Sequence, residues 1–335
     1  MPRLVVAMSR TTWAELMTPA LVARLRAVAS VDLDIVIDDF SGPGAAAAVQ
    51  GCEVLLTGWG APRVDVAALD LMPDLRAIVH AAGTVKHHLT TDVFTRGIQV
   101  AAAVEANAIP VAEFTFAAIV LAAKRATWFA REYRTRRDLG VRRMPPGAGQ
   151  VGANGIVVGV VGASRVGRLV LDRLRSLDAR VLVYDPYLAD ADAAALGAEL
   201  AGLDRLVRDS DIVTLHAPAL PETRNMIGRA QLTAMRDGAV LINTSRGALV
   251  DTGALIAELA SGRIEAVLDV TEPEPLPPDS PLFDLPNVQL TPHIAGALGN
   301  EVPRLLEQAV AEIERLAAGQ PLAHPVVAAD LERIA

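Results

Sequence analysis

Three polar residues in the second half of the chain have the side chains that a hydride transfer requires. Arg246 follows the apolar run Ala239–Asn243, Glu274 lies in a proline-rich stretch, and His293 follows the apolar run Val288–Leu290. Histidine titrates near neutral pH, so it can take a proton from an alcohol or return one to a carbonyl oxygen. A nearby carboxylate stabilises the imidazolium and fixes its tautomer, while arginine holds a carboxylate with two hydrogen bonds. These residue types predict interconversion of a 2-hydroxy acid and a 2-oxo acid.

Each of the three residues also has a commoner structural interpretation when it is taken alone. An arginine after a strand usually forms a surface ion pair, a glutamate in a proline-rich loop is usually solvated, and a lone histidine is more often packed or capping. Their shared position favours the chemical interpretation, because all three follow strands of one series that begins with a nucleotide-binding pattern. Ligands of open α/β sheets bind at the carboxyl ends of the strands.

That pattern starts at Gly155 and consists of a strand, a glycine turn and a helix. The run from Gly155 to Gly162 leads into Ala-Ser164-Arg-Val-Gly167, which matches G-x-G-x-x-G except for serine at the middle glycine. The expected helix N-terminus presents free N–H groups and a partial positive charge to a diphosphate, and the Ser164 hydroxyl can donate as well. The alternative is a glycine turn in an α/β protein that binds no dinucleotide.

Asp185 ends the next apolar run, about 20 residues beyond the glycines, where a carboxylate bonds the ribose of the adenosine. A carboxylate here repels a 2′-phosphate, and no arginine follows it immediately. The sequence therefore predicts NAD rather than NADP as the cofactor.

Composition limits the other functions. The chain has 335 residues, 52% of them apolar, enough for two hydrophobic cores, and its net charge of −8 argues against nucleic acid as a partner. Cys52 is the only cysteine, which fits a cytoplasmic protein without disulfides or thiolate metal sites. Ala108–Ala123 is the most membrane-like stretch, but it contains Glu113 and is shorter than the roughly 20 residues of a membrane span, so a buried helix is predicted. Met1–Arg10 does not have the pattern of a signal peptide.

Two series of short apolar strands, each alternating with helices, predict an α/β protein with two doubly wound parallel-sheet domains. The predicted strands are Leu4–Met8, Leu33–Ile37, Val54–Thr57, Leu75–Val79 and Ile98–Ala101, then Val157–Val161, Arg180–Val183, Ile212–Leu215, Ala239–Asn243, Ala266–Asp269 and Val288–Leu290. Arg131–Gln150 is interpreted as a loop or short helix between the series, and Pro273–Asp284 as irregular.

Taken together and in this order, the motifs resemble the D-isomer-specific 2-hydroxyacid dehydrogenase family. The resemblance covers nearly the whole chain and is strongest from Val111 to Gly296. The matching segments are Val111-Ala-Glu113, Gly162–Gly167, His216-Ala-Pro-Ala-Leu-Pro-Glu-Thr223, Asn243-Thr-Ser-Arg246-Gly, Leu268-Asp269-Val, Glu274-Pro and Thr291-Pro-His293.

The resemblance implies a Rossmann NAD-binding domain, residues 107–295, inserted into a flavodoxin-like substrate-binding domain formed by residues 1–106 and 296–335. The active site would lie in a cleft closed by a hinge motion, in a homodimer. Arg246 would bind the substrate, His293 would be the acid/base, and Glu274 would be its partner. Backbone N–H groups of Gly83 and Thr84 would hold the carboxylate of a small anionic 2-hydroxy or 2-oxo acid.

The resemblance also implies a set of cofactor contacts. Asp269 would meet the nicotinamide carboxamide, His216–Pro218 would line the adenosine side, and Thr244 and Ser245 would lie nearer the nicotinamide. The full set is Gly162, Ser164, Arg165, Val166, Gly167, Asp185, His216, Ala217, Pro218, Thr223, Thr244, Ser245 and Asp269.

Two positions depart from the family pattern. Ser164 replaces the middle glycine, and the substrate-domain loop reads Ala82-Gly-Thr-Val-Lys-His-His88 where the usual pattern is Gly-x-Asp-Asn-hydrophobic-Asp. Lys86, His87 and His88 are unusual there and are expected to alter substrate preference. No metal site is predicted, because His87 and His88 are adjacent and do not easily share one ion, while His80 and His324 have the character of structural or exposed residues.

Two other functions stay open from the sequence. One is a related dehydrogenase of another small anion. The other is a nucleotide-sensing binding protein similar to the family's transcriptional corepressors, which act by binding partners. Such a protein is expected to carry extended tails, and the near absence of tails favours the enzyme.

Overall fold

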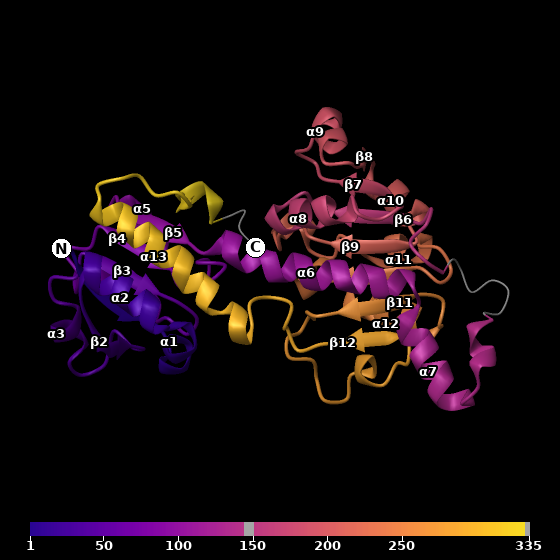
Figure 1. The fold of residues 1–335 in the computed structure, drawn as a ribbon, viewed down its shortest axis with the longest axis horizontal. Helices are drawn as coiled ribbons and strands as arrows, with labels where there is room; N and C mark the ends of the chain where they lie inside the picture. The colour runs from indigo at the N-terminus through magenta and orange to yellow at the C-terminus, as the bar shows by residue number, and fades with distance from the viewer. Residues whose placement is uncertain (144–150, 332–335) are drawn as a thin grey trace. The chain divides into compact units, whose positions relative to one another are not determined.

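The computed structural model describes residues 1–143 and 151–331, and the chain divides into two units (Figure 1). Unit 1 comprises Met1–Ala108 and the chain from Ala297 onward, and unit 2 comprises Ile109–Gly296. The chain passes from unit 1 to unit 2 within helix α6 (Val104–Ala123).

Unit 1 contains a sheet in the order β13-β5-β4-β3-β1-β2, parallel except for β13. Its strands are β1 (Arg3–Ala7), β2 (Ser30–Ile37), β3 (Val54–Thr57), β4 (Ala77–His80), β5 (Gln99–Ala102) and β13 (Pro325–Val326). Its helices are α1 (Arg10–Leu16), α2 (Pro19–Val28), α3 (Ala45–Val49), α4 (Val66–Asp70), α5 (Thr91–Thr95) and α13 (Pro303–Ala317).

Both faces of this sheet are covered, because side chains of a strand alternate between its two faces. From β1, Leu4 and Val6 belong to the core that includes α13 residues such as Leu305. Val5 and Ala7 belong to the opposite core. The near-continuous apolar strands read from the sequence are explained by this double burial.

Unit 2 contains an all-parallel sheet in the order β12-β11-β10-β9-β6-β7-β8. Its strands are β6 (Val157–Val161), β7 (Arg180–Tyr184), β8 (Glu199–Leu200), β9 (Ile212–Leu215), β10 (Val240–Asn243), β11 (Glu265–Leu268) and β12 (Val288–Leu290). Besides most of α6, its helices are α7 (Ala126–Arg136), α8 (Arg165–Leu174), α9 (Asp190–Ala195), α10 (Leu203–Asp209), α11 (Arg229–Ala234) and α12 (Thr252–Ala260). The chain order reverses at β6, between β7 and β9, so ligands are expected at the carboxyl ends there.

The structure adds elements that were not predicted. The short strands β8 and β13 have too few residues for an alternating pattern. The first part of Arg131–Gln150 continues helix α7 and is followed by a 3-10 turn at Leu139–Arg142, because arginine is a good helix former. Residues 144–150 lie outside the described part of the chain.

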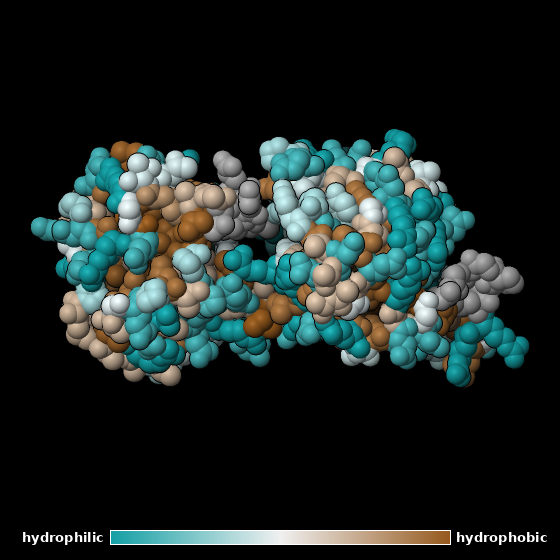
Figure 2. Space-filling view, turned by 90° about the horizontal axis from the view of Figure 1, so that it is seen from above, coloured by the Kyte–Doolittle hydropathy of each residue, from teal (hydrophilic) through white to brown (hydrophobic). Residues whose placement is uncertain are grey.

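Helix α6 is long and apolar enough to cross a membrane by length and composition. Its exposed positions are Glu113, Ala117 and Leu121, which lie four residues apart and form one stripe, while its other residues are buried or half-buried. This distribution is that of a helix packed inside a protein, as predicted. On the side drawn in Figure 2, unit 1 shows a hydrophobic patch among hydrophilic residues, and unit 2 is mostly hydrophilic.

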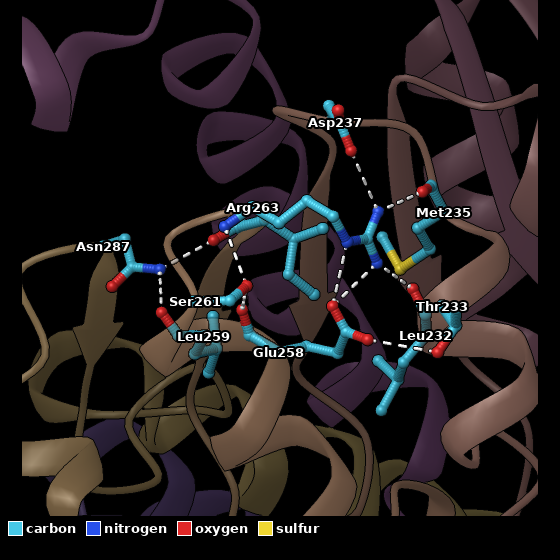
Figure 3. Close-up of polar contacts among 10 residues, drawn as sticks. Leu232, Thr233, Met235, Asp237, Glu258, Leu259, Ser261, Arg263 and Asn287 are labelled. Carbon is cyan, nitrogen blue, oxygen red and sulfur yellow. Dashed lines mark hydrogen bonds and ion pairs between the residues drawn. The ribbon is translucent and has the colours of Figure 1, made fainter.

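Arg263 connects helices α11 and α12 of unit 2 through its polar contacts (Figure 3). Its guanidinium bonds the Glu258 carboxylate at 2.9 Å and donates to the carbonyls of Leu232 and Met235 at the end of α11. A cation at a helix C-terminus satisfies carbonyls that have no partner within the helix. These contacts hold α11 and α12 together near the start of β11. The candidate site lies at the other, carboxyl ends of β10 and β11.

Each unit encloses one buried, neutral histidine, and this makes both units sensitive to acid. Burial lowers the pKa of His80 in unit 1 to about 3, and it does the same for His216 in unit 2. The pKa in the folded state lies below the value of about 6.5 in the unfolded chain. The contribution of each neutral histidine to the free energy of unfolding is therefore fully present above about pH 6.5 and is lost as pH falls toward about 3.

We expect the free energy of unfolding to fall by about 2 kcal/mol for each of these histidines between pH 7 and pH 5. Urea unfolding at several pH values measures this loss, and His216→Gln should reduce it because the replacement does not titrate. A free energy that stays constant from pH 7 to pH 5 would contradict the assignment.

Candidate active site

The fingerprint turn of unit 2 requires glycine at two of its positions. Gly162 follows β6 with φ +98°, and a Cβ there would come 2.6 Å from the backbone nitrogen of Ala217. A Cβ on Gly167 would lie 2.1 Å from the Gly162 carbonyl oxygen. Both contacts are too short for any side chain, so α8 approaches the strand ends closely only because these residues are glycines.

Ser164, at the position of the missing glycine, is the N-cap of α8. Its hydroxyl oxygen accepts a hydrogen bond from the Gly167 N–H at 3.3 Å. Because the oxygen acts as the acceptor in this bond, the hydroxyl proton is available for a further acceptor. The substitution therefore keeps the turn and adds a donor where a diphosphate is expected, next to Arg165 and Val166 in the first turn of the helix.

Asp185 directly follows β7, and both of its carboxylate oxygens are held by backbone amides. One oxygen accepts from the Ala163 N–H at 2.8 Å, and the other accepts from the Tyr187 N–H at 2.9 Å. A carboxylate oxygen has more than one lone pair, so both can still accept from the hydroxyls of a ribose. The side chain is thus oriented before any ligand binds.

The loop after β9 is closed by its own hydrogen bonds. Thr223 donates from its hydroxyl to the Pro218 carbonyl at 2.6 Å and accepts from the Leu220 N–H at 2.8 Å. The Ala217 carbonyl accepts from the Ser245 hydroxyl at 3.0 Å, which ties this loop to the one after β10.

His216, at the start of this loop, is buried beside the fingerprint. Its Nε2 lies 3.0 Å from the Thr214 hydroxyl, and its Nδ1 has no hydrogen-bond partner among the described residues. Burial lowers the pKa of the ring and keeps it neutral near pH 7, so it can line a binding site without adding a charge.

Arg246 follows β10 and is positioned by the backbone of its own loop. Asn243 accepts from the Ser245 N–H at 3.1 Å and donates to the Arg246 carbonyl at 2.9 Å. The guanidinium donates to the Ser245 carbonyl at 2.6 Å. Burial lowers the pKa of Arg246, and the nearby Glu274 carboxylate opposes this shift, so Arg246 and Glu274 face a common region. Thr244 is anchored to α6 by a buried bond of 2.7 Å between its hydroxyl and that of Thr115.

His293 and Glu274 meet, as the residue types suggested. The Nδ1 atom of His293 lies 2.8 Å from a carboxylate oxygen of Glu274, and the two side chains are 49% and 42% exposed. His293 has φ +55°, a left-handed conformation that costs energy for a residue with a side chain. The surrounding loop must therefore enforce this conformation.

Asp269 enforces it. Its buried carboxylate accepts from the Thr291 hydroxyl at 2.6 Å and from the backbone N–H groups of Ile294 and Ala295, each at 2.8 Å. Its carbonyl accepts from the His293 N–H at 2.9 Å. The sequence suggested only a nicotinamide contact for Asp269. The missed signal is that a carboxylate directly after a buried strand needs several donors nearby.

The predicted residues thus fall into two groups. All of the candidate catalytic and cofactor residues stand in unit 2, in the loops at the carboxyl ends of its parallel strands or in the first turn of α8. Gly83 and Thr84 stand in unit 1, in the loop after β4. Among the described residues, no group of three or more metal-binding side chains comes together.

This arrangement is that of an NAD-binding dehydrogenase domain, and comparison with known proteins agrees. Residues 116–295 match the family model described as "D-isomer specific 2-hydroxyacid dehydrogenase, NAD binding domain". A D-3-phosphoglycerate dehydrogenase of Mycobacterium tuberculosis is 37% identical over 81% of this chain and 50% of its own length. A glyoxylate reductase of Korarchaeum cryptofilum is 35% identical over 77% of this chain and 78% of its own.

A solved structure agrees over almost the full chain. The TT0316 protein of Thermus thermophilus is 31% identical, with a TM-score of 0.75 over 97% of this chain and 100% of its own. This chain therefore belongs to the D-isomer specific 2-hydroxyacid dehydrogenase family, and the predicted family, fold class and cofactor, NAD, are confirmed. It spans about half the length of the D-3-phosphoglycerate dehydrogenases that it matches.

The position of Asp185 generates a prediction about cofactor choice. We expect the protein to bind NADH more tightly than NADPH, because the carboxylate repels a 2′-phosphate. Asp185→Asn keeps an oxygen that can accept from the Ala163 N–H but removes the charge, so it should narrow the preference by about tenfold. Fluorescence titration with both cofactors measures this ratio. Tighter binding of NADPH by the unaltered protein would show that Asp185 does not select the cofactor.

Proposed function

We propose that this protein transfers a hydride between NAD and a small D-2-hydroxy acid or its 2-oxo acid. The observation that carries the proposal is the 2.8 Å contact of His293 with Glu274, at the same edge of the sheet as the dinucleotide fingerprint. Bound NAD would accept the hydride from C2 of the hydroxy acid, and bound NADH would return it. The corepressor-like alternative is not favoured, because the similar proteins are named dehydrogenases and reductases.

His293 is proposed as the acid/base. With Nδ1 turned toward Glu274, Nε2 is the ring nitrogen left for proton transfer, and the carboxylate stabilises the positive charge that forms. In oxidation, Nε2 takes the hydroxyl proton as the carbonyl forms. In reduction, it returns that proton to the oxygen.

Arg246 is proposed to bind the substrate carboxylate and to polarise the neighbouring carbonyl. One of its terminal nitrogens is fixed on the Ser245 carbonyl, which limits the rotation of the guanidinium. The burial that lowers its pKa also strengthens a charged hydrogen bond. The backbone N–H groups of Gly83 and Thr84 are proposed as further donors to the substrate carboxylate.

The assembly and location are proposed as a homodimer in the cytoplasm. Helix α7 supports a partner surface, because none of its residues is buried and Tyr133 is 50% exposed. In the 3-10 turn that follows, Leu139 is 64% exposed. Exposed apolar residues on one such segment are typical of contacts between subunits. The single buried Cys52 agrees with a reducing compartment.

Removal of Arg246 should affect the substrate and not the cofactor. We expect Arg246→Ala to lower kcat/KM for a 2-oxo acid by about a thousandfold, because a charged contact is lost where negative charge develops. Arg246→Lys should recover only part of the activity, since an ammonium cannot form the same pair of bonds. Steady-state kinetics with NADH and a panel of 2-oxo acids measures the effect. Near-normal activity of the Ala variant on a good substrate would remove Arg246 from the mechanism.

Removal of His293 should abolish most of the chemistry. We expect His293→Ala to lower kcat by roughly a hundredfold to ten-thousandfold, the usual contribution of a general acid. Glu274→Gln should lower kcat less, because the amide can still bond Nδ1 but does not stabilise the imidazolium. NADH affinity, measured by fluorescence titration, should be unchanged in both variants. If Glu274→Gln retains full kcat, the carboxylate has no part in proton transfer.

A further inference from the structure

Two histidines outside the proposed catalytic centre bond to each other in unit 1. His80 ends β4 and is fully buried, and its Nε2 lies 3.1 Å from the Nε2 of His88. The other nitrogen of His80, Nδ1, lies 2.8 Å from the hydroxyl of Thr57, the residue paired with it at the end of β3. The three side chains form one continuous hydrogen-bonded chain.

This hydrogen-bonded arrangement requires that at most one of the two histidine rings carries a positive charge. A bond between two Nε2 atoms needs a proton on one and a lone pair on the other. Thr57 can donate to His80, which then donates to His88, or all the bonds can run the other way. Burial lowers the pKa of both rings, so both histidines are uncharged near pH 7.

The pair lies under the loop to which the substrate carboxylate was assigned. His80 precedes the loop, His88 ends it, and their bond closes it across its base. The Thr84 backbone raises the pKa of both rings against the effect of burial, so the backbone of this loop lies close to the histidine pair.

Three consecutive backbone N–H groups of this loop have no hydrogen-bond acceptor among the described residues. Within residues 1–143 and 151–331, the N–H groups of Gly83, Thr84 and Val85 meet no acceptor, whereas the next one, Lys86, donates to the Thr84 hydroxyl at 3.3 Å. Consecutive free N–H groups form a concave site for an anion. The loop also packs closely against Asn107, because a Cβ on Gly83 would come 2.9 Å from the side-chain nitrogen of Asn107 and would displace it.

We propose that Thr57, His80 and His88 are positioning residues that hold the Gly83–Val85 amides in the orientation that binds the substrate carboxylate. The inference rests on the proposed function and extends it to residues that never touch the substrate. The buried side chains of Ala82 and Val85 offer the rings no polar partner, so the rings are held by their hydrogen bonds to each other and to Thr57.

The test uses variants of the full chain that break the hydrogen-bonded chain at its two ends. Thr57→Val preserves shape and removes the hydroxyl, and His88→Leu removes the other end. His88→Gln offers an amide that can still bond His80, and His324→Leu is the matched control at a half-exposed histidine elsewhere in unit 1. Glyoxylate with NADH is the kinetic probe. Oxamate, a non-reacting carboxylate, is the binding probe, followed through the amide NMR shifts of Gly83–Val85.

We expect Thr57→Val and His88→Leu to raise KM for glyoxylate about tenfold, with kcat and NADH affinity within about twofold of the unaltered protein. His88→Gln should restore most of the loss, and His324→Leu should change nothing. Oxamate should shift the amides in the unaltered protein, and His88→Leu should need about tenfold more oxamate for the same shifts. An unchanged KM in a folded Thr57→Val variant, or unchanged oxamate shifts in His88→Leu, overturns the positioning role.

Failure of the proposed function has a different signature. If the unaltered protein reduces neither glyoxylate nor any other 2-oxo acid, but oxamate still shifts the three amides and His88→Leu weakens this binding about tenfold, the dehydrogenase assignment fails and the positioned anion site is supported. If oxamate shifts no amide even in the unaltered protein, the positioning proposal is wrong whatever the enzyme does.

Discussion

The geometry of the proposed catalytic pair depends on one buried carboxylate. Asp269 is 1% exposed and accepts hydrogen bonds from one hydroxyl and two backbone amides of the loop after β12. A buried charge is tolerated only while such donors surround it, and removal of the donors would cost several kcal/mol. The loop is therefore held to the end of β11, and His293 keeps a backbone conformation that an unsupported loop would leave.

A second constraint is steric and acts at glycines where neighbouring loops meet. A Cβ on Gly247 would lie 2.0 Å from the backbone of Thr271, so the loop that carries Arg246 packs directly against the loop that leads to Glu274. Gly162 and Gly167 do the same for the fingerprint and the loop after β9. Close approach of bare backbones brings an arginine, a carboxylate and a cofactor site from distant parts of the sequence to one sheet edge.

Much of this site could be predicted because its signals are local in sequence. Strand ends, the glycine turn and the order of the motifs placed Arg246, Glu274 and His293 at one edge without knowledge of their contacts. What could not be predicted depends on pairs far apart in the chain. The bond from Thr57 to His80 spans 23 residues, and those from Asp269 span more than 20, so no spacing rule indicates them. The N-cap role of Ser164 differs from these contacts because it is local in sequence, and serine directly before a helix is a recognisable cap.

The histidines show how environment, rather than residue type, assigns chemistry. His80 and His216 are buried, and their pKa of about 3 keeps them neutral throughout the physiological range. Neither can exchange a proton with a substrate near pH 7, although both are well ordered by hydrogen bonds to threonine. His293 is 49% exposed and its Nδ1 lies 2.8 Å from the Glu274 carboxylate, which leaves Nε2 as the ring nitrogen for proton transfer in the proposed reaction. The proposed reaction moves one proton per turnover and requires one histidine that is open to the substrate. Neutral buried rings such as those of His80 and His216 can support the structure without competing for that proton.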